Sequence, residues 1–326
     1  HYNMPDAVRL TGSLEIEALV KSLNTIVERH ESLRTVFIAD EDGQPFQVSH
    51  PFSVIDVPVI DISLLPEGER EFDLAEIVSA EASKPFDLSS DLMIRVQVVK
   101  VDVQEHVLLV TMHHIASDGW SMGILINEFS ALYSAYVQGK DNPLPALEIQ
   151  YADYAYWQRD WLQGDVLDEQ LGYWREQLVD LPVVHNLPLD KPRPAVQAYS
   201  GINYHHKISS SVNNKLNTLC QSIGGTLFMG LHAVFSVLLS RYSNETDVVM
   251  GSPIANREQA EVANLIGFFV NTLVLRADLS CNPSFNDLLE QSKRMLLDAY
   301  AHQQVPFEQL VETLQPKRNI AQRLRG

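Results

Sequence analysis

The chain has 326 residues, of which 45% are hydrophobic and 20% are charged, so its composition is that of a globular protein with room for two domains or one large one. Its 24 lysines and arginines and 42 aspartates and glutamates leave a formal net charge of −18, which disfavours binding to the phosphate backbone of nucleic acid. No apolar run reaches the roughly 18 residues of a membrane span, no secretory signal opens the chain, and the two cysteines lack metal-binding or redox spacing, so we expect a cytoplasmic protein without a bound metal.

The first half of the chain predicts a helix, two strands and a second helix. The first helix begins near Ser13, a candidate N-cap. Its apolar side chains fall on one face: Leu19, Leu23, Ile26 and Val27. Residues 94–98 alternate like a half-buried strand, and residues 107–112 are nearly all apolar, like a central strand covered on both faces. Residues 121–136 then have the pattern of a helix.

The second half continues the alternation. A helical apolar stripe covers residues 227–238, and residues 247–251 are typical of a short strand. Ser284 with Asp287 three residues later resembles a helix N-cap followed by an acidic residue. Strands and helices that alternate without a repeat period indicate an α/β or α+β protein.

The domain organisation follows from one proline-rich stretch. Residues 187–194 contain three prolines, which remove backbone donors and favour an extended segment outside any sheet. We therefore expect an N-terminal lobe over residues 1–186, a linker over 187–198 and a C-terminal lobe over 199–326.

The segment between the second predicted strand and its helix holds the most chemistry. Side chains alternate along a strand, so His113 and His114 point in opposite directions, and one can face a cleft while the other packs inward. Gly119 is expected to let the backbone turn tightly into the helix, and Asp118 to cap that helix or form an ion pair.

Three interpretations compete for the two histidines. His114 suits a catalytic base or positioning group, because the unperturbed imidazole pKa of about 6.5 lies near working pH. A metal site is disfavoured, since adjacent strand residues diverge and no third ligand has a usual spacing. Satisfied core histidines at a strand end are the third interpretation, and the local pattern alone leaves it open beside the first.

Five segments together resemble the condensation domains of nonribosomal peptide synthetases. Residues 113–119 match their HHxxxDG signature. The others, in family order, are 29–37 (RHExLRTxF), 151–157 (YxDYAxW), 266–276 (IGxFVNTxxxR) and 302–308 (HQDxPFE, with Gln304 in place of the usual aspartate). The family's first and last motifs would lie outside the sequence, so the resemblance implies a domain truncated at both ends. We interpret the 29–37 and 151–157 motifs as packing elements.

The resemblance implies a fold and a reaction. The fold is α/β (α+β), with two chloramphenicol acetyltransferase-like lobes in a V-shaped pseudo-dimer. The amine of an acceptor aminoacyl thioester attacks the carbonyl of a donor aminoacyl or peptidyl thioester. Both substrates are carried on the phosphopantetheine of peptidyl carrier domains, an adenylation domain is adjacent, and the chain itself binds no cofactor, nucleic acid or membrane.

The resemblance also implies roles for particular residues. His114 is the catalytic residue and either takes the amine proton or fixes the amine by a hydrogen bond. His113, Asp118, Gly119 and Arg257 organise the site, with Asp118 paired to Arg257. Ser121 is interpreted as a residue of the helix start rather than a nucleophile. Candidates for lining the substrate tunnel are Trp120, Ser121 and Asn271.

Other functions share parts of this pattern. An epimerisation domain has the same signature but inverts the α-carbon of one carrier-bound residue, and a truncated fragment that binds carriers without turnover is a non-catalytic alternative. A heterocyclisation domain would replace HHxxxDG with DxxxxD, and a free acetyl-CoA-dependent acyltransferase would not have all five motifs. The form of the motifs favours condensation with an L-configured donor.

Overall fold

The chain divides into two compact units. The structure, a computed structural model, describes residues 2–182, 184–192, 201–202 and 204–314. The first unit comprises His1–Asp160 and Arg257–Val270, and the second comprises Trp161–Asn256 and Asn271–Gly326. Arg257–Val270, hereafter the return segment, connects two strands of the second unit but packs in the first.

This division differs from the expected lobe boundary at 187–198. The proline content of that stretch is a local signal, whereas the units are defined by packing between segments far apart in the sequence. Residues 193–198 of the expected linker, and residues 315–326, lie outside the described residues.

A four-stranded sheet forms the centre of the first unit, in the order β1–β6–β5–β4. β1 (Asn3–Thr11), β6 (Glu105–His113) and β5 (Ile94–Asp102) are antiparallel neighbours, and β4 (Val59–Asp61) pairs parallel with β5. β5 and β6 confirm the strands predicted at 94–98 and 107–112. The sequence pattern does not predict β1, because it is mostly exposed and its place depends on pairing with β6.

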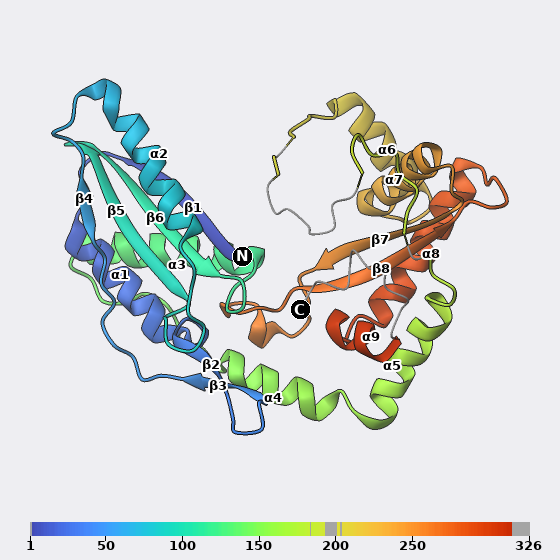
Figure 1. Cartoon of the computed structure of the whole chain (residues 1–326), viewed down its shortest axis with the longest axis horizontal. Helices are drawn as coiled ribbons and strands as arrows, with labels where there is room; N and C mark the ends of the chain where they lie inside the picture. The colour runs from blue at the N-terminus through green and yellow to red at the C-terminus, as the bar shows by residue number, and fades with distance from the viewer. Residues whose placement is uncertain (1, 183, 193–200, 203, 315–326) are drawn as a thin grey trace. The chain divides into compact units, whose positions relative to one another are not determined.

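Helices cover both faces of this sheet (Figure 1). α1 (Ile16–Arg29) and α3 (Gly119–Val137) pack on one face and α2 (Glu67–Ser83) on the other. The side chains of β5 and β6 supply both cores: Val96, Val98, Leu108, Val110 and Met112 contribute to the α1/α3 side, and Val99, Val101, Val107 and Leu109 to the α2 side. The prediction that β6 is covered on both faces is therefore confirmed.

The start of α1 corrects one prediction. The helix begins at Ile16 with Glu15 as its N-cap residue, so Ser13 is not the cap. The backbone N–H of Glu15 donates to the hydroxyl of Tyr133 in α3 at 3.0 Å. This long-range contact, rather than the local preference of serine, accompanies the helix start.

Shorter elements complete the first unit. α1 leads through a 3₁₀ turn (Glu31–Arg34) into the antiparallel hairpin of β2 (Thr35–Ala39) and β3 (Pro45–Ser49). α4 (Tyr151–Trp161) follows α3 along the chain. The 29–37 motif thus runs from the end of a helix into a strand, and its Leu33 and Val36 side chains are buried, as expected of a packing element.

The second unit is built on the antiparallel pair β7 (Asp247–Ile254) and β8 (Asn271–Asp278). The helices described in this unit are α5 (Gly164–Gln177), α6 (Ser210–Ser222), α7 (Leu227–Ser243), α8 (Phe285–Ala301) and α9 (Phe307–Leu314). α5 and α9 share a core with β8, and α6 and α7 pack on α8. α8 opens with the predicted cap, since the Ser284 hydroxyl accepts from the Asp287 N–H at 3.3 Å.

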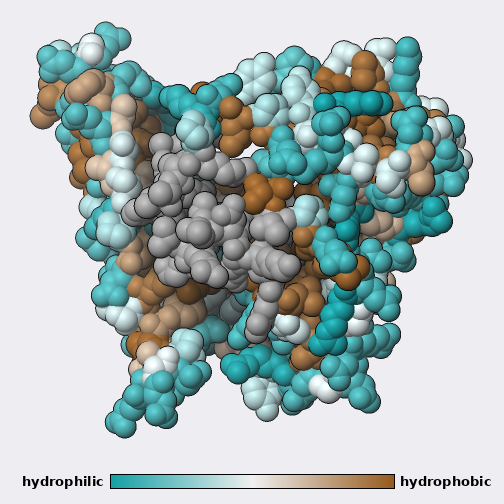
Figure 2. All heavy atoms as spheres, turned by 45° about the vertical axis from the view of Figure 1, so that its right-hand side comes forward, coloured by the Kyte–Doolittle hydropathy of each residue, from teal (hydrophilic) through white to brown (hydrophobic). Residues whose placement is uncertain are grey.

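Much of the visible surface is hydrophilic, with hydrophobic patches between the hydrophilic side chains (Figure 2). Within the described ranges, no single helix has the length and apolarity of a membrane span; only α6 and α7 taken together, across a bend of 108°, meet those criteria.

Candidate active site

His113 is the last residue of β6, and its ring is part of an aromatic cluster. The ring lies edge-on to Phe86 and Tyr2, with centroid separations of 5.6 and 6.4 Å. Its Nδ1 accepts a hydrogen bond from the N–H of Ile115 at 3.1 Å, so the neutral ring has its proton on Nε2. Burial, followed by nearby positive charge, lowers the pKa of His113. These contacts support a structural role.

His114 has the opposite tautomer. Its Nδ1 lies 2.7 Å from the carbonyl oxygen of Ser117, and because a carbonyl only accepts, Nδ1 bears the proton. The lone pair of the neutral ring is then on Nε2, which has no hydrogen-bond partner among the residues that the structure describes. Phe268 of the return segment packs edge-on against this ring, with centroids 5.2 Å apart and planes at 82°. His114 is thus an oriented hydrogen-bond acceptor and potential base.

Asp118 fulfils both of its expected roles at once. Its Oδ1 accepts from the backbone N–H of Ser121 at 2.8 Å, which caps α3. The same oxygen lies 3.2 Å from Nη2 of Arg257. Only 3% of the Asp118 side chain and 2% of the Arg257 side chain are exposed, so this predicted ion pair is confirmed and buried.

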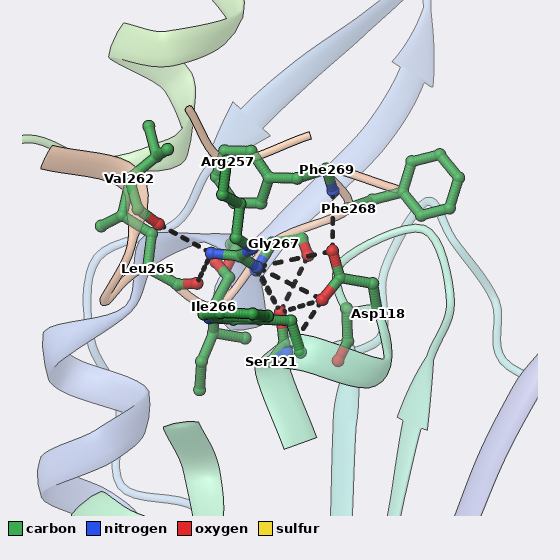
Figure 3. A network of polar contacts seen from close by, with 12 residues as sticks. Asp118, Ser121, Arg257, Val262, Leu265, Ile266, Gly267, Phe268 and Phe269 are labelled. Carbon is green, nitrogen blue, oxygen red and sulfur yellow. Dashed lines mark hydrogen bonds and ion pairs between the residues drawn. The ribbon is translucent and has the colours of Figure 1, made fainter. Parts of the chain in front are cut away.

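Arg257 makes hydrogen bonds and a ring contact within the return segment (Figure 3). Nη1 donates to the carbonyl oxygens of Val262 and Leu265, both at 2.7 Å, and the guanidinium carbon lies 4.0 Å from the ring centroid of Phe269. Burial lowers the pKa of Arg257, and the charge of Asp118 opposes that effect. The guanidinium therefore links the return segment to the start of α3.

Ser121 lies inside this network. Its hydroxyl oxygen accepts from Nη2 of Arg257 at 2.9 Å and from the N–H of Gly267 at 3.1 Å. Its proton is placed for Asp118 Oδ1 at 2.8 Å or the Gly267 carbonyl at 3.0 Å. Because Ser121 is completely buried, it belongs to the supporting framework, which differs from the expected tunnel-lining position.

Trp120 and Gly119 lie at the exposed side of the same helix start. The Trp120 side chain is 54% exposed, and its Nε1 donates to the carbonyl of Ala263 at 3.1 Å. Gly119 is the first residue of α3, has no positive φ, and leaves open space where a Cβ would stand. The expectation that the backbone turn needs glycine here is wrong, since Gly119 has no positive φ and the chain enters α3 from an extended Asp118, whose side chain caps the helix.

Asn271, the third tunnel candidate, belongs to the second unit and is buried. Its Nδ2 donates to the carbonyls of Gln303 and Val305, both at 2.9 Å, and its Oδ1 accepts from the N–H groups of Thr272 and Phe307 at 2.8 and 2.9 Å. All four hydrogen-bonding positions are used, so the amide holds the loop before α9. This placement differs from a tunnel-lining role.

Sequence reasoning did not predict two sets of contacts around this site. Phe268 packs directly against the His114 ring. Glu128 of α3 forms a buried link to His30 and Arg29, at 2.9 Å from each. An acidic residue on the otherwise apolar face of a predicted helix is the signal that points to Glu128. In the described parts of the chain, no group of His, Cys, Asp or Glu side chains has the arrangement of a metal site.

Two glycine variants test how tightly this site is packed. A Cβ on Gly267 would overlap Cδ2 of Tyr151 and approach Cε2 of Phe269 to 2.7 Å, so we expect Gly267→Ala to destabilise the first unit by about 1–3 kcal/mol. Gly119→Ala should leave stability unchanged or raise it by up to about 1 kcal/mol. Thermal unfolding of both variants checks this. Equal melting of Gly267→Ala and the parent chain would contradict the close packing around Tyr151.

Comparisons with known proteins agree with this geometry. A family model described as Condensation domain matches residues 1–324. A linear gramicidin synthase of Brevibacillus parabrevis is 48% identical over 320 residues, and Malpibaldin synthetase of Mortierella alpina is 44% identical over 321. Each alignment covers 98% of this chain but 6% of the relative, so the chain is similar to one small part of each protein.

Solved structures share the fold. The X-domain from teicoplanin biosynthesis matches with a TM-score of 0.88 at 28% identity, over 98% of this chain and 70% of that one. A four-domain nonribosomal peptide synthetase bound to AMP and glycine matches at 0.83 and 26%, over 98% and 24%. These likenesses confirm the expected mixed α/β fold. Because the family match runs through both the HHxxxDG segment and the return segment, the chain belongs to the condensation-domain family of nonribosomal peptide synthetases.

Proposed function

We propose that this chain forms a peptide bond between two carrier-bound building blocks. The observation that supports this is the orientation of His114. Its Nδ1–H is committed to the Ser117 carbonyl at 2.7 Å, so in the neutral ring Nε2 is an acceptor with a lone pair. An amine nucleophile needs such a partner, because its attack on a carbonyl ends with the loss of a proton.

The proposed reaction needs no reactant other than the two carrier-bound substrates. The acceptor amine attacks the carbonyl carbon of the donor thioester, a C–N bond forms, and the C–S bond breaks. His114 Nε2 takes the amine proton and the imidazolium returns it to the departing phosphopantetheine thiolate, so the ring is neutral again at the end of the step. Because a thioester is already activated, holding the two substrates together accounts for much of the acceleration, roughly 7–11 kcal/mol for well-oriented reactants.

The partners of this reaction are donor and acceptor peptidyl carrier domains, with an adenylation domain adjacent in the same assembly, in the cytoplasm. The family membership and the small share of each relative that the chain matches support this assignment. The phosphopantetheine groups belong to the carriers, so the chain supplies positioning and proton transfer.

The test uses two separate carrier domains. One is charged with an L-aminoacyl group and the other with a second aminoacyl group, the chain is added, and intact-protein mass spectrometry follows the acceptor carrier. A dipeptidyl group on the acceptor is the expected result. A folded chain that yields no dipeptide contradicts the proposal, and inversion of the donor α-carbon without dipeptide assigns the chain to epimerisation instead.

A further inference from the structure

Side chains, rather than a neighbouring strand, hold the backbone of the return segment beside His114. The Ile266 N–H donates to Nδ1 of His30 at 3.2 Å, and the Ile266 carbonyl accepts from the Ser32 hydroxyl at 2.6 Å. The Phe268 carbonyl accepts from the Tyr151 hydroxyl at 2.8 Å. The backbone is thus anchored in the first unit before Phe268, at Ile266, and after it, at the Phe268 carbonyl.

The His30 contact has a defined direction. The Ile266 N–H is a donor, so Nδ1 of His30 is the acceptor and the neutral ring has its proton on Nε2, 2.9 Å from Oε2 of Glu128. Glu128 is itself buried, and its other carboxylate oxygen, Oε1, accepts from Nε of Arg29 at 2.9 Å. A buried carboxylate therefore fixes the orientation of the imidazole that holds Ile266.

The anchored backbone carries the ring that touches the catalytic candidate. Phe268 lies two residues after Ile266, and its ring packs edge-on against His114 at 5.2 Å. We propose that His30 and Ser32 are positioning residues, a role that rests on the proposed function. They hold the backbone N–H and carbonyl of Ile266 and thereby fix Phe268 against the His114 ring. In this arrangement they touch no substrate and act through Phe268.

A pair of serine variants tests the proposal without removing a large side chain. Ser32→Ala removes the hydroxyl that holds the Ile266 carbonyl. Ser22→Ala is the matched control, because its hydroxyl is equally buried and donates to the Ala18 carbonyl at 2.7 Å within α1, away from the return segment. Each variant loses one buried hydroxyl-to-carbonyl bond, but the Ala18 carbonyl keeps its helical bond from the Ser22 N–H, so Ser22→Ala should cost less stability than Ser32→Ala.

Imidazole NMR supplies the readout that a purely structural role would not move. With histidine labelled in the 326-residue chain, the His114 signals are assigned by their loss in His114→Ala, and Phe268→Leu defines their position without the neighbouring ring. Ser32→Ala should shift the His114 signals toward the Phe268→Leu position, while Ser22→Ala leaves them in place. Unmoved signals in Ser32→Ala, or equal movement in both variants, overturn the proposal.

Two replacements of His30 separate its two hydrogen bonds. His30→Asn keeps an acceptor near the position of Nδ1 for Ile266, and His30→Gln keeps a donor near the position of Nε2 for Glu128. We expect Asn to retain the parent His114 signals and Gln to displace them. The opposite order, or identical signals in the two folded variants, contradicts the role of the Ile266 bond.

Kinetic measurements then test whether the placement of Phe268 against His114 affects the reaction. In the two-carrier assay, Ser32→Ala and His30→Gln should lower kcat on the order of tenfold to 100-fold with little change in KM for either carrier, since misplacement of a catalytic group affects the chemical step. A rise in KM alone overturns the inference. If the parent chain forms no dipeptide, the proposed function fails, while the NMR comparison still decides whether His30 and Ser32 position Phe268.

Discussion

Replacement of His114 by alanine is expected to lower the rate of dipeptide formation by about 10²–10⁴-fold, the usual contribution of a positioned acid–base group. The loss should appear in kcat, because Nε2 is the ring nitrogen left to meet the amine once Nδ1 is bonded to Ser117. His50→Ala, at an exposed histidine of the same unit, is the control and should retain the parent rate. Rates are measured by mass spectrometry under saturating carriers.

The glutamine variant at the same position distinguishes proton transfer from positioning. Glutamine places an amide oxygen near the position of Nε2, where it accepts a hydrogen bond but does not take a proton at neutral pH. We expect His114→Gln to be about as slow as His114→Ala. A rate within tenfold of the parent chain would instead assign His114 to holding the amine.

Removal of the Asp118 carboxylate is expected to cost the largest amount of stability, about 3–5 kcal/mol, because Asp118→Ala leaves the Arg257 charge buried without its partner. The variant also loses the α3 cap and the acceptor for the Phe269 N–H, at 3.0 Å from Oδ2. Calorimetry and denaturant unfolding of the whole chain measure the change in the free energy of unfolding. A loss below about 1 kcal/mol would show that the pair is not desolvated as its burial indicates.

Two controls isolate the buried pair. Lys100 of β5 and Asp61 of β4 form an ion pair that is more exposed than the Asp118–Arg257 pair. Lys100→Ala removes one partner of that pair and should leave the stability close to that of the parent chain. The double variant Asp118→Ala with Arg257→Ala should lose less than the sum of the single variants, since no unpaired charge is left behind. Simple additivity would contradict a direct interaction between the two side chains.

Local patterns predicted much of the fold and part of the site. The β5 and β6 strands and the capped start of α8 follow from side-chain alternation and capping chemistry. These effects act over a few neighbouring residues, so one sequence is enough to detect them. The Asp118–Arg257 pair was expected only through the family resemblance, because no local rule links residues 139 positions apart.

Other features depended on contacts that no window of sequence contains. Ser13 and Gly119 satisfy a local preference, but Glu15 is the N-cap residue of α1, and the Asp118 side chain caps α3 without a strained glycine after it. Asn271 has the chemistry of a ligand contact, yet its amide is used entirely inside the second unit. A residue type states which bonds are possible, whereas the neighbours decide which of them form.

The sequence by itself determined the class of the fold and the family, and through the family resemblance it predicted His114 as the catalytic residue. Periodicity, capping residues and ordered motifs are properties of short segments, so they can be recognised from the sequence alone. Only the tertiary structure decided which tautomer His114 adopts, that Phe268 packs on it, and that His30 holds Ile266 across 236 residues of sequence. Those outcomes depend on the burial of donors and acceptors against distant partners, because a buried polar group must be paired and only the folded chain supplies the partner.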